Sequence, residues 1–236
     1  MVWDKNSKKI LKLSFLFFSA FLFLGLTKIK IWSILGTKSK FSLSVFFGPT
    51  LAKIFGIKFG IGIIILTHLI GLAAGLYKIN ALKDIFVFFP IIFAGIYFSK
   101  IFKNEKKLLF IPLICIFLFL WHPIGREVWF YSGFWLIPIF ISLFKEKLDK
   151  ILRFPIFKIY GYSLGAAFTD HAIGSVMYLY LLNIPSHFWI SAIPLTIIER
   201  LTIAGGIEIC YLFEKAIIEI LEKTPIFIEF KKLVFQ

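Results

Sequence analysis

The sequence predicts an all-α fold, a polytopic transmembrane helix bundle of about six to eight spans in a single membrane domain. Composition supports this prediction: 59% of the 236 residues are hydrophobic and 19% are aromatic. In a soluble domain only about half of the residues are apolar. The mean hydropathy of this sequence is also high, at +0.90. The charged residues lie between apolar runs that show little amphipathic period, a pattern typical of helices surrounded by hydrocarbon.

The apolar runs give the positions of the spans, since about 20 residues are needed to cross the hydrocarbon. The run from 41 to 75 is too long for one upright span. We expect Gly48-Pro49 and Gly56 to divide it into a short first segment, either spanning or re-entrant, and a fuller second one. The predicted spans are 11–26, 41–52, 57–76, 85–99, 108–120, 129–144, 160–182 and 187–212.

The basic residues predict the orientation of the chain in the membrane. The formal net charge of +14 could indicate a nucleic-acid partner, but the lysines and arginines lie in the connections beside the spans. That placement favours membrane topology and contact with the headgroups of a lipid bilayer. Lysine is most frequent in alternate connections, which predicts a multi-pass cell-membrane protein with both termini in the cytoplasm. No nucleic acid is expected as a partner.

Several motifs of common enzyme classes are missing from the sequence. It contains no P-loop and no H-E-x-x-H. The four histidines include no i,i+4 pair, and Cys115 and Cys210 lie apart in apolar runs without metal-ligand spacing. We therefore predict no enzymatic activity, no cofactor and no metal site.

Four ionisable residues interrupt the last two predicted spans: Asp170, His171, Glu199 and Arg200. Charge inside hydrocarbon is costly, so such residues indicate a functional site by default. Each pair lies about fifteen residues from the turn that joins the spans, which places both pairs about 20 Å below that turn. Pairing of Asp170 or Glu199 with Arg200 would offset the cost of burial. Two interpretations stay open: an ion pair that fixes helix register, or a path for a ligand or ion.

Further candidate binding residues lie above and beside this level. His122, Arg126 and His187 fall in the outer connections, and His68 lies within the third predicted span. Arg126 is the only basic residue of its connection, and a guanidinium group suits the recognition of carboxylate or phosphate. The neighbouring tryptophans are expected to anchor the chain at the membrane interface; they are Trp121, Trp129, Trp135 and Trp189.

Small residues recur at four-residue spacing within the predicted spans. Such pairs allow membrane helices to approach closely, either within the chain or against a partner subunit. The pairs are Gly56/Gly60, Gly71/Gly75 and Gly161/Gly165.

One part of the sequence resembles a known family. The segment 44–52 (SVFFGPTLA), followed by Gly56, Gly60 and the segment 67–71 (THLIG), is similar to the substrate-binding (S) components of energy-coupling-factor transporters. The alternative is that the sequence resembles a related prokaryotic or archaeal family of polytopic membrane proteins. The resemblance implies binding of a vitamin or vitamin precursor at the outer face. It also implies a transmembrane coupling subunit with separate ATPases, so that this chain itself holds no nucleotide.

Three functional hypotheses follow from these residues. The first is a membrane transport subunit that binds a small organic solute from the outside, past His122, Arg126 and His187, for uptake. The second is a membrane-embedded enzyme acting on a lipid or prenyl substrate, with Asp170, His171 and Glu199 as acid–base groups. The third is a non-catalytic membrane scaffold that uses the paired glycines for assembly.

Overall fold

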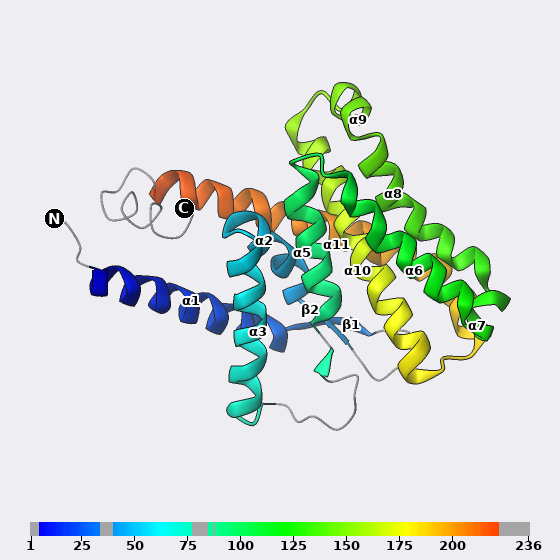
Figure 1. The fold of residues 1–236 in the computed structure, drawn as a ribbon, viewed down its shortest axis with the longest axis horizontal. Coiled ribbons are helices and arrows are strands. Elements are labelled where there is room, and N and C mark those ends of the chain that lie inside the picture. The colour runs from blue at the N-terminus through cyan, green and yellow to red at the C-terminus, as the bar shows by residue number, and fades with distance from the viewer. Residues whose placement is uncertain (1–4, 34–39, 77–84, 87, 222–236) are drawn as a thin grey trace.

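The computed structural model describes residues 5–33, 40–76, 85–86 and 88–221, and in this part of the chain the fold is helical with one small hairpin (Figure 1). The hairpin pairs β1 (Lys30–Ser33) with β2 (Lys40–Ser42) in antiparallel register. The helices are α1 (Lys5–Lys28), α2 (Ser44–Ile54), α3 (Ile57–Ala73), α5 (Phe89–Ile101), α6 (Phe110–Trp121), α7 (Pro123–Glu127), α8 (Leu136–Leu143), α9 (Lys145–Ile151), α10 (Pro155–Leu182) and α11 (Ser186–Leu221), with 3-10 turns η1 (Lys106–Leu109) and η2 (Trp129–Trp135).

The all-α prediction is confirmed in its coarse form, because each predicted apolar run contains a helix. The expected division of the run 41–75 is found, because α2 ends at Ile54 and α3 begins at Ile57. It comes at Gly56, whose φ of 82° falls in the left-handed region that glycine tolerates best. The part assigned to Gly48-Pro49 is wrong, since Pro49 lies inside α2. The predicted span 85–99 lies partly outside the described residues, which omit 77–84 and 87.

The membrane prediction is only partly matched by helix length. Within the described residues, one helix (Ser186–Ile220) is long and apolar enough to cross a membrane, judged by length and composition. Shorter apolar helices occupy Phe17–Lys28, Ile57–Ala73, Phe89–Ile101 and Trp129–Leu143. A polytopic bundle is therefore treated below as a proposal.

Helix α10 is central to the packing. It contacts α5, α6, α8 and α11, while α2 packs on both α5 and α11 and α3 packs on α1 and α2. In Figure 1, α6 and α8 run alongside α10, and α1 and the C-terminal part of α11 extend together from the opposite side of the molecule. Residues of α10 therefore meet side chains from most of the fold, and this places the charged residues of α10 at its centre.

Close approach of α10 to α5 depends on Gly165. A Cβ atom at this position would lie 2.5 Å from the ring of Tyr97. Tyr97 is fully buried, and its hydroxyl donates to the carbonyl of Pro138 (2.8 Å) while accepting from the hydroxyl of Ser142 (2.9 Å). A Cβ atom at Gly60 would likewise lie 2.5 Å from the backbone nitrogen of Ala52. Two of the six predicted small residues thus serve packing within the chain.

Aromatic side chains form a hydrophobic core between α6, η2 and α11. Phe119 lies edge-on to Trp135 (5.0 Å between ring centroids) and to Trp189 (5.3 Å). Both tryptophans are buried, and the indole N–H of Trp189 donates to the carbonyl of Ile184 at 3.0 Å. The expectation that all four tryptophans anchor the interface is therefore wrong for Trp135 and Trp189, because their rings fill a core. Trp121 and Trp129 are exposed.

Candidate functional site

A buried ion-pair cluster joins the two longest helices of the C-terminal half. The guanidinium of Arg200 on α11 is 1% exposed, and its Nη1 donates to Oδ2 of Asp170 on α10 at 2.9 Å. Nη2 of the same side chain lies 3.5 Å from Oε2 of Glu199. We call Asp170, Glu199 and Arg200 the charged triad. The predicted match in level between the two helices is thus present in the structure.

Helix α10 also offers Arg200 a contact from its backbone. Nη1 of Arg200 approaches the carbonyl oxygen of Ala167 at 3.5 Å, and Ala167 is fully buried. This contact is longer than the ion pair with Asp170, so Asp170 remains the main partner of the guanidinium on α10.

The triad has a formal charge imbalance. It contains two carboxylates and one guanidinium, so its sum is −1 when all three groups are ionised. Oε1 of Glu199 is buried and has no hydrogen-bond partner among the described residues. A buried acceptor without a donor costs free energy of about 1–3 kcal/mol. The triad can therefore gain stability from a donor or cation that reaches this oxygen.

His171 belongs to a separate hydrogen-bond network next to the triad. The indole N–H of Trp135 lies 3.2 Å from Nδ1 of His171, and the hydroxyl of Tyr131 lies 3.0 Å from Nε2. Indole nitrogen can only donate, so Nδ1 must accept and carries no proton. In the neutral ring the proton is then on Nε2, which donates to the oxygen of Tyr131.

The same argument fixes the direction of the next bond. Because the oxygen of Tyr131 accepts from His171, its own hydrogen is free to point at Oγ1 of Thr196, which lies 3.0 Å away. The chain of donors thus runs from Trp135 through His171 and Tyr131 to Thr196, and it connects η2, α10 and α11. Both ring nitrogens of His171 are engaged, so this histidine acts as a neutral connector.

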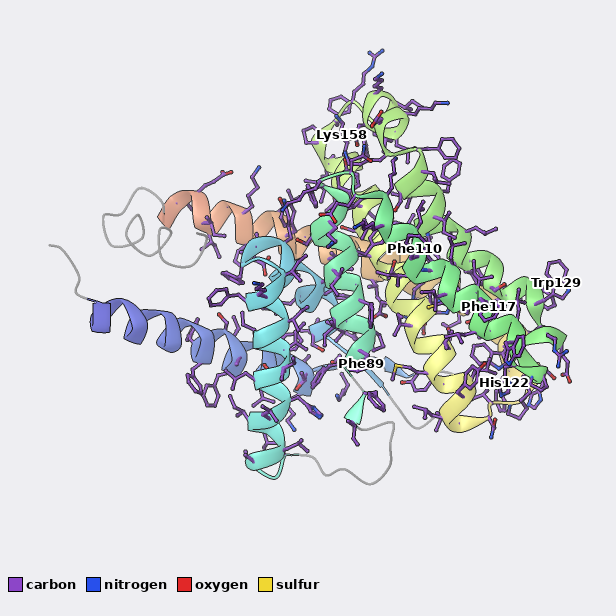
Figure 2. All side chains as sticks on the ribbon, in the orientation of Figure 1. Phe89, Phe110, Phe117, His122, Trp129 and Lys158 are labelled. Atoms are coloured by element: carbon purple, nitrogen blue, oxygen red, sulfur yellow. The ribbon has the colours of Figure 1, made fainter. Side chains whose placement is uncertain are left out.

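The remaining predicted site residues lie apart from the triad. His68 is on α3, with its ring edge-on to Phe88 at 5.0 Å. His122 packs edge-on to Tyr180 at 4.9 Å, and Arg126 and His187 are exposed. Figure 2 shows His122 and Trp129 at the α7 end of the molecule, far from Lys158. The structure brings together Asp170, Glu199 and Arg200, with His171 beside them.

Three residues of the network were not predicted: Tyr131, Trp135 and Thr196. Thr196 could have been found, because it lies four residues before Arg200 and therefore on the same face of α11. No comparable signal marks Tyr131 and Trp135, since they occur in an aromatic-rich run that also fits an interface anchor. Among the described residues, no group of three or more histidine, cysteine, aspartate or glutamate side chains could hold a metal ion.

Comparison with known proteins identifies one relative. No family model matches the chain, and no solved structure matches it. The uncharacterized protein MJ0923 of Methanocaldococcus jannaschii is 29% identical over 222 residues, which cover 89% of this chain and 73% of that protein. Its name states no activity, so the functional argument below rests on the residues of this chain.

Proposed function

We propose that this chain is a membrane-embedded transport subunit that binds a small organic solute from the outer face for uptake. One observation carries the proposal: a charged triad is buried at the centre of a molecule whose helices expose many large apolar side chains. In a soluble protein, charged residues are almost never fully buried, and a large exposed apolar surface is unusual.

Helix α6 illustrates the apolar surface (Figure 2). Phe110 is 63% exposed, Phe117 is 61% exposed and Trp121 is 71% exposed. These positions recur at helical spacing, so one whole side of α6 is an exposed apolar stripe. The same holds for α8 and α11, whose exposed residues include Leu136, Phe140, Leu143, Ile190, Ile197, Ile198, Leu201 and Ile209. A surface of this extent calls for a lipid or protein partner.

The polar residues are found on the inner sides of the same helices. Buried positions include Ser163, Thr169 and Ser175 on α10, and Thr196 and Glu208 on α11. Several of the apolar helices are shorter than about 20 residues, a length that a membrane protein can accommodate by local thinning of the bilayer. We therefore propose a multi-pass cell-membrane protein, with both termini in the cytoplasm.

The triad is the proposed binding site. An intramembrane ionisable group indicates function by default, and Oε1 of Glu199 is an acceptor that still lacks a donor. The exposed Arg126 and His187, at the end that also carries His122, would form the outer entrance. A coupling subunit with ATPases is the proposed energy source, following the resemblance to the energy-coupling-factor transporters.

The test is binding by the purified protein. A panel of vitamins and their precursors is added to the detergent-solubilised chain, and the thermal unfolding midpoint is measured. A bound solute stabilises the folded state by RT ln(1 + [L]/Kd), so at least one compound should raise the midpoint in a saturable way. Absence of any shift, together with absence of a small molecule that co-purifies with the protein, would contradict the proposal.

A scaffold is the second candidate, because Arg200 is buried and already paired with Asp170. In that case the triad only fixes the register of α10 and α11. Conversion of Glu199 to glutamine would then leave both uptake and assembly unchanged. The enzyme hypothesis is less well supported, since both ring nitrogens of His171 are occupied by Trp135 and Tyr131.

A further inference from the structure

We propose that Glu199 binds a small monovalent cationic group, either an alkali-metal ion or the N–H-bearing ammonium group of an organic solute. The inference rests on the proposed function, because it names the class of ligand that the charged triad would accept. It begins from two independent observations, the charge sum of the triad and the position of Oε1 of Glu199.

The charge sum requires a counter-charge. Arg200 is shared between Asp170 at 2.9 Å and Glu199 at 3.5 Å, so one guanidinium faces two carboxylates. The neighbouring His171 does not add a positive charge, because its Nδ1 accepts from Trp135 and therefore carries no proton. An isolated negative charge away from water is strongly unfavourable, and a cation next to it removes that cost.

Hydrogen bonding locates the counter-charge. The shorter contact of Arg200 goes to Asp170, whereas Glu199 has only the longer one, through Oε2. Its second oxygen, Oε1, is buried without a partner in the part of the chain that the structure describes, and Glu199 as a whole is 9% exposed. The nearby imidazole of His171 has no donor to spare, since its Nε2 faces Tyr131. A cationic group at Oε1 would satisfy this acceptor.

The donor set favours one positive charge over two. Calcium and magnesium take six or more oxygen ligands and are bound through several carboxylates. Among the described residues, no cluster of three or more candidate metal ligands is found. A single carboxylate oxygen next to an existing guanidinium suits a monovalent ion or an ammonium group, which hydrogen-bonds through its N–H.

The variant Glu199→Gln separates this inference from its alternatives. Glutamine has nearly the shape of glutamate, can still accept from Arg200, and removes the negative charge. We expect the variant to fold and to lose its response to cations. Glu127→Gln is the matched control, because it makes the same chemical change at an exposed residue of α7. It should respond to cations as the original chain does.

The experiment measures the thermal unfolding midpoint in a neutral detergent at constant ionic strength. Tetramethylammonium chloride serves as the baseline, because this cation has no N–H to donate. It is replaced stepwise by sodium, potassium or methylammonium chloride. We expect one of the three to raise the midpoint of the original chain saturably, by roughly 5 °C at a hundredfold excess over Kd. The sodium and potassium arms indicate an alkali-metal site, and the methylammonium arm indicates the amine of a solute.

Two outcomes would overturn the inference. In the first, no cation shifts the midpoint of the original chain relative to the baseline; if the midpoint then still depends on pH, a proton supplies the counter-charge. In the second, Glu199→Gln responds to the same cation as strongly as the original chain. These results are independent of the vitamin panel: a vitamin can bind without any cation effect, and a cation can bind when every vitamin fails.

Discussion

At the residue scale, the two carboxylates of the triad are not equivalent. Asp170 makes the shorter contact with Arg200, whereas Glu199 makes a longer one and keeps an unpartnered oxygen. We predict that Asp170→Asn lowers the free energy of unfolding by about 3 kcal/mol, because removal of one partner of a buried pair leaves a poorly compensated charge. Glu199→Gln should cost much less. Unfolding in mixed micelles would measure both, and equal losses would contradict this ranking.

The connector network gives a second prediction. Tyr131→Phe removes the hydroxyl that joins His171 to Thr196, which leaves a buried N–H without an acceptor. The expected loss of unfolding free energy is about 1–3 kcal/mol. Tyr180→Phe is the control: its hydroxyl donates to the carbonyl of Leu118 at an exposed position, where water can replace it. A loss of the same size in both variants would mean that the network adds nothing beyond an ordinary hydrogen bond.

Sequence reasoning found the triad but not the role of its neighbour. The rise of a helix is constant, so distance from the turn was enough to place Asp170 level with Arg200. Adjacent residues point about 100° apart on a helix, which is why Asp170 faces α11 while His171 faces Tyr131 and Trp135. Which aromatic side chains surround His171 depends on the packing of η2 against α10. No local pattern encodes that contact.

At the scale of elements, the contact of α10 with α5 depends on one glycine. Gly165→Ala would place a methyl group 2.5 Å from the ring of Tyr97, which is buried and held by Pro138 and Ser142. We expect a loss of about 1–3 kcal/mol of unfolding free energy from this overpacking. Gly161→Ala makes the same change on the same helix, where the nearest atom lies 3.8 Å away. It should be neutral or stabilising by up to about 1 kcal/mol, as for alanine in a helix interior.

The short helix α9 gives a prediction about pH. Burial raises the pKa of Asp149, but hydrogen bonds from Lys145 and Tyr162 outweigh this effect and hold the pKa below its ordinary value. A carboxyl group whose pKa is lowered by folding contributes stability above its unfolded pKa and loses it as the pH falls. Stability should therefore decline from about pH 4 downward.

Asp149→Asn is the control for this pH effect. The variant should be less stable at neutral pH, and its thermal midpoint should change less between pH 5 and pH 3 than that of the original chain. An identical acid response in both proteins would show that other carboxyl groups govern it.

The elements themselves were largely predictable. Long apolar runs give helices, and the turn at Asn183 before α11 was visible because the left-handed conformation at a helix end suits asparagine. The failures have local causes. Pro49 lacks only one hydrogen bond and is tolerated within α2, and the hairpin of β1 and β2 occurs in a basic connection with no alternating pattern.

At the scale of the whole molecule, two ends differ in chemistry. The α7 end carries exposed Trp121, Trp129 and Arg126, and the α9 end carries Lys147, Lys150 and Lys158. In a multi-pass protein the basic end would face the cytoplasm. Composition predicted a lipid-facing surface in general, but the packing of particular helices could not be predicted. Lipid-facing and buried sides of an apolar helix are both apolar, so hydropathy does not tell them apart.

Cysteine labelling in intact cells tests the central claim most directly, namely that the molecule crosses the membrane with its α7 end and its α9 end on opposite sides. Cys115 and Cys210 are first replaced by alanine. Single cysteines are then introduced as Glu127→Cys at the α7 end and Lys147→Cys at the α9 end, both at exposed positions. A membrane-impermeant maleimide should label Glu127→Cys in intact cells, and Lys147→Cys only after permeabilisation. Labelling of both variants in intact cells, or of neither until the cells are opened, would contradict the claim.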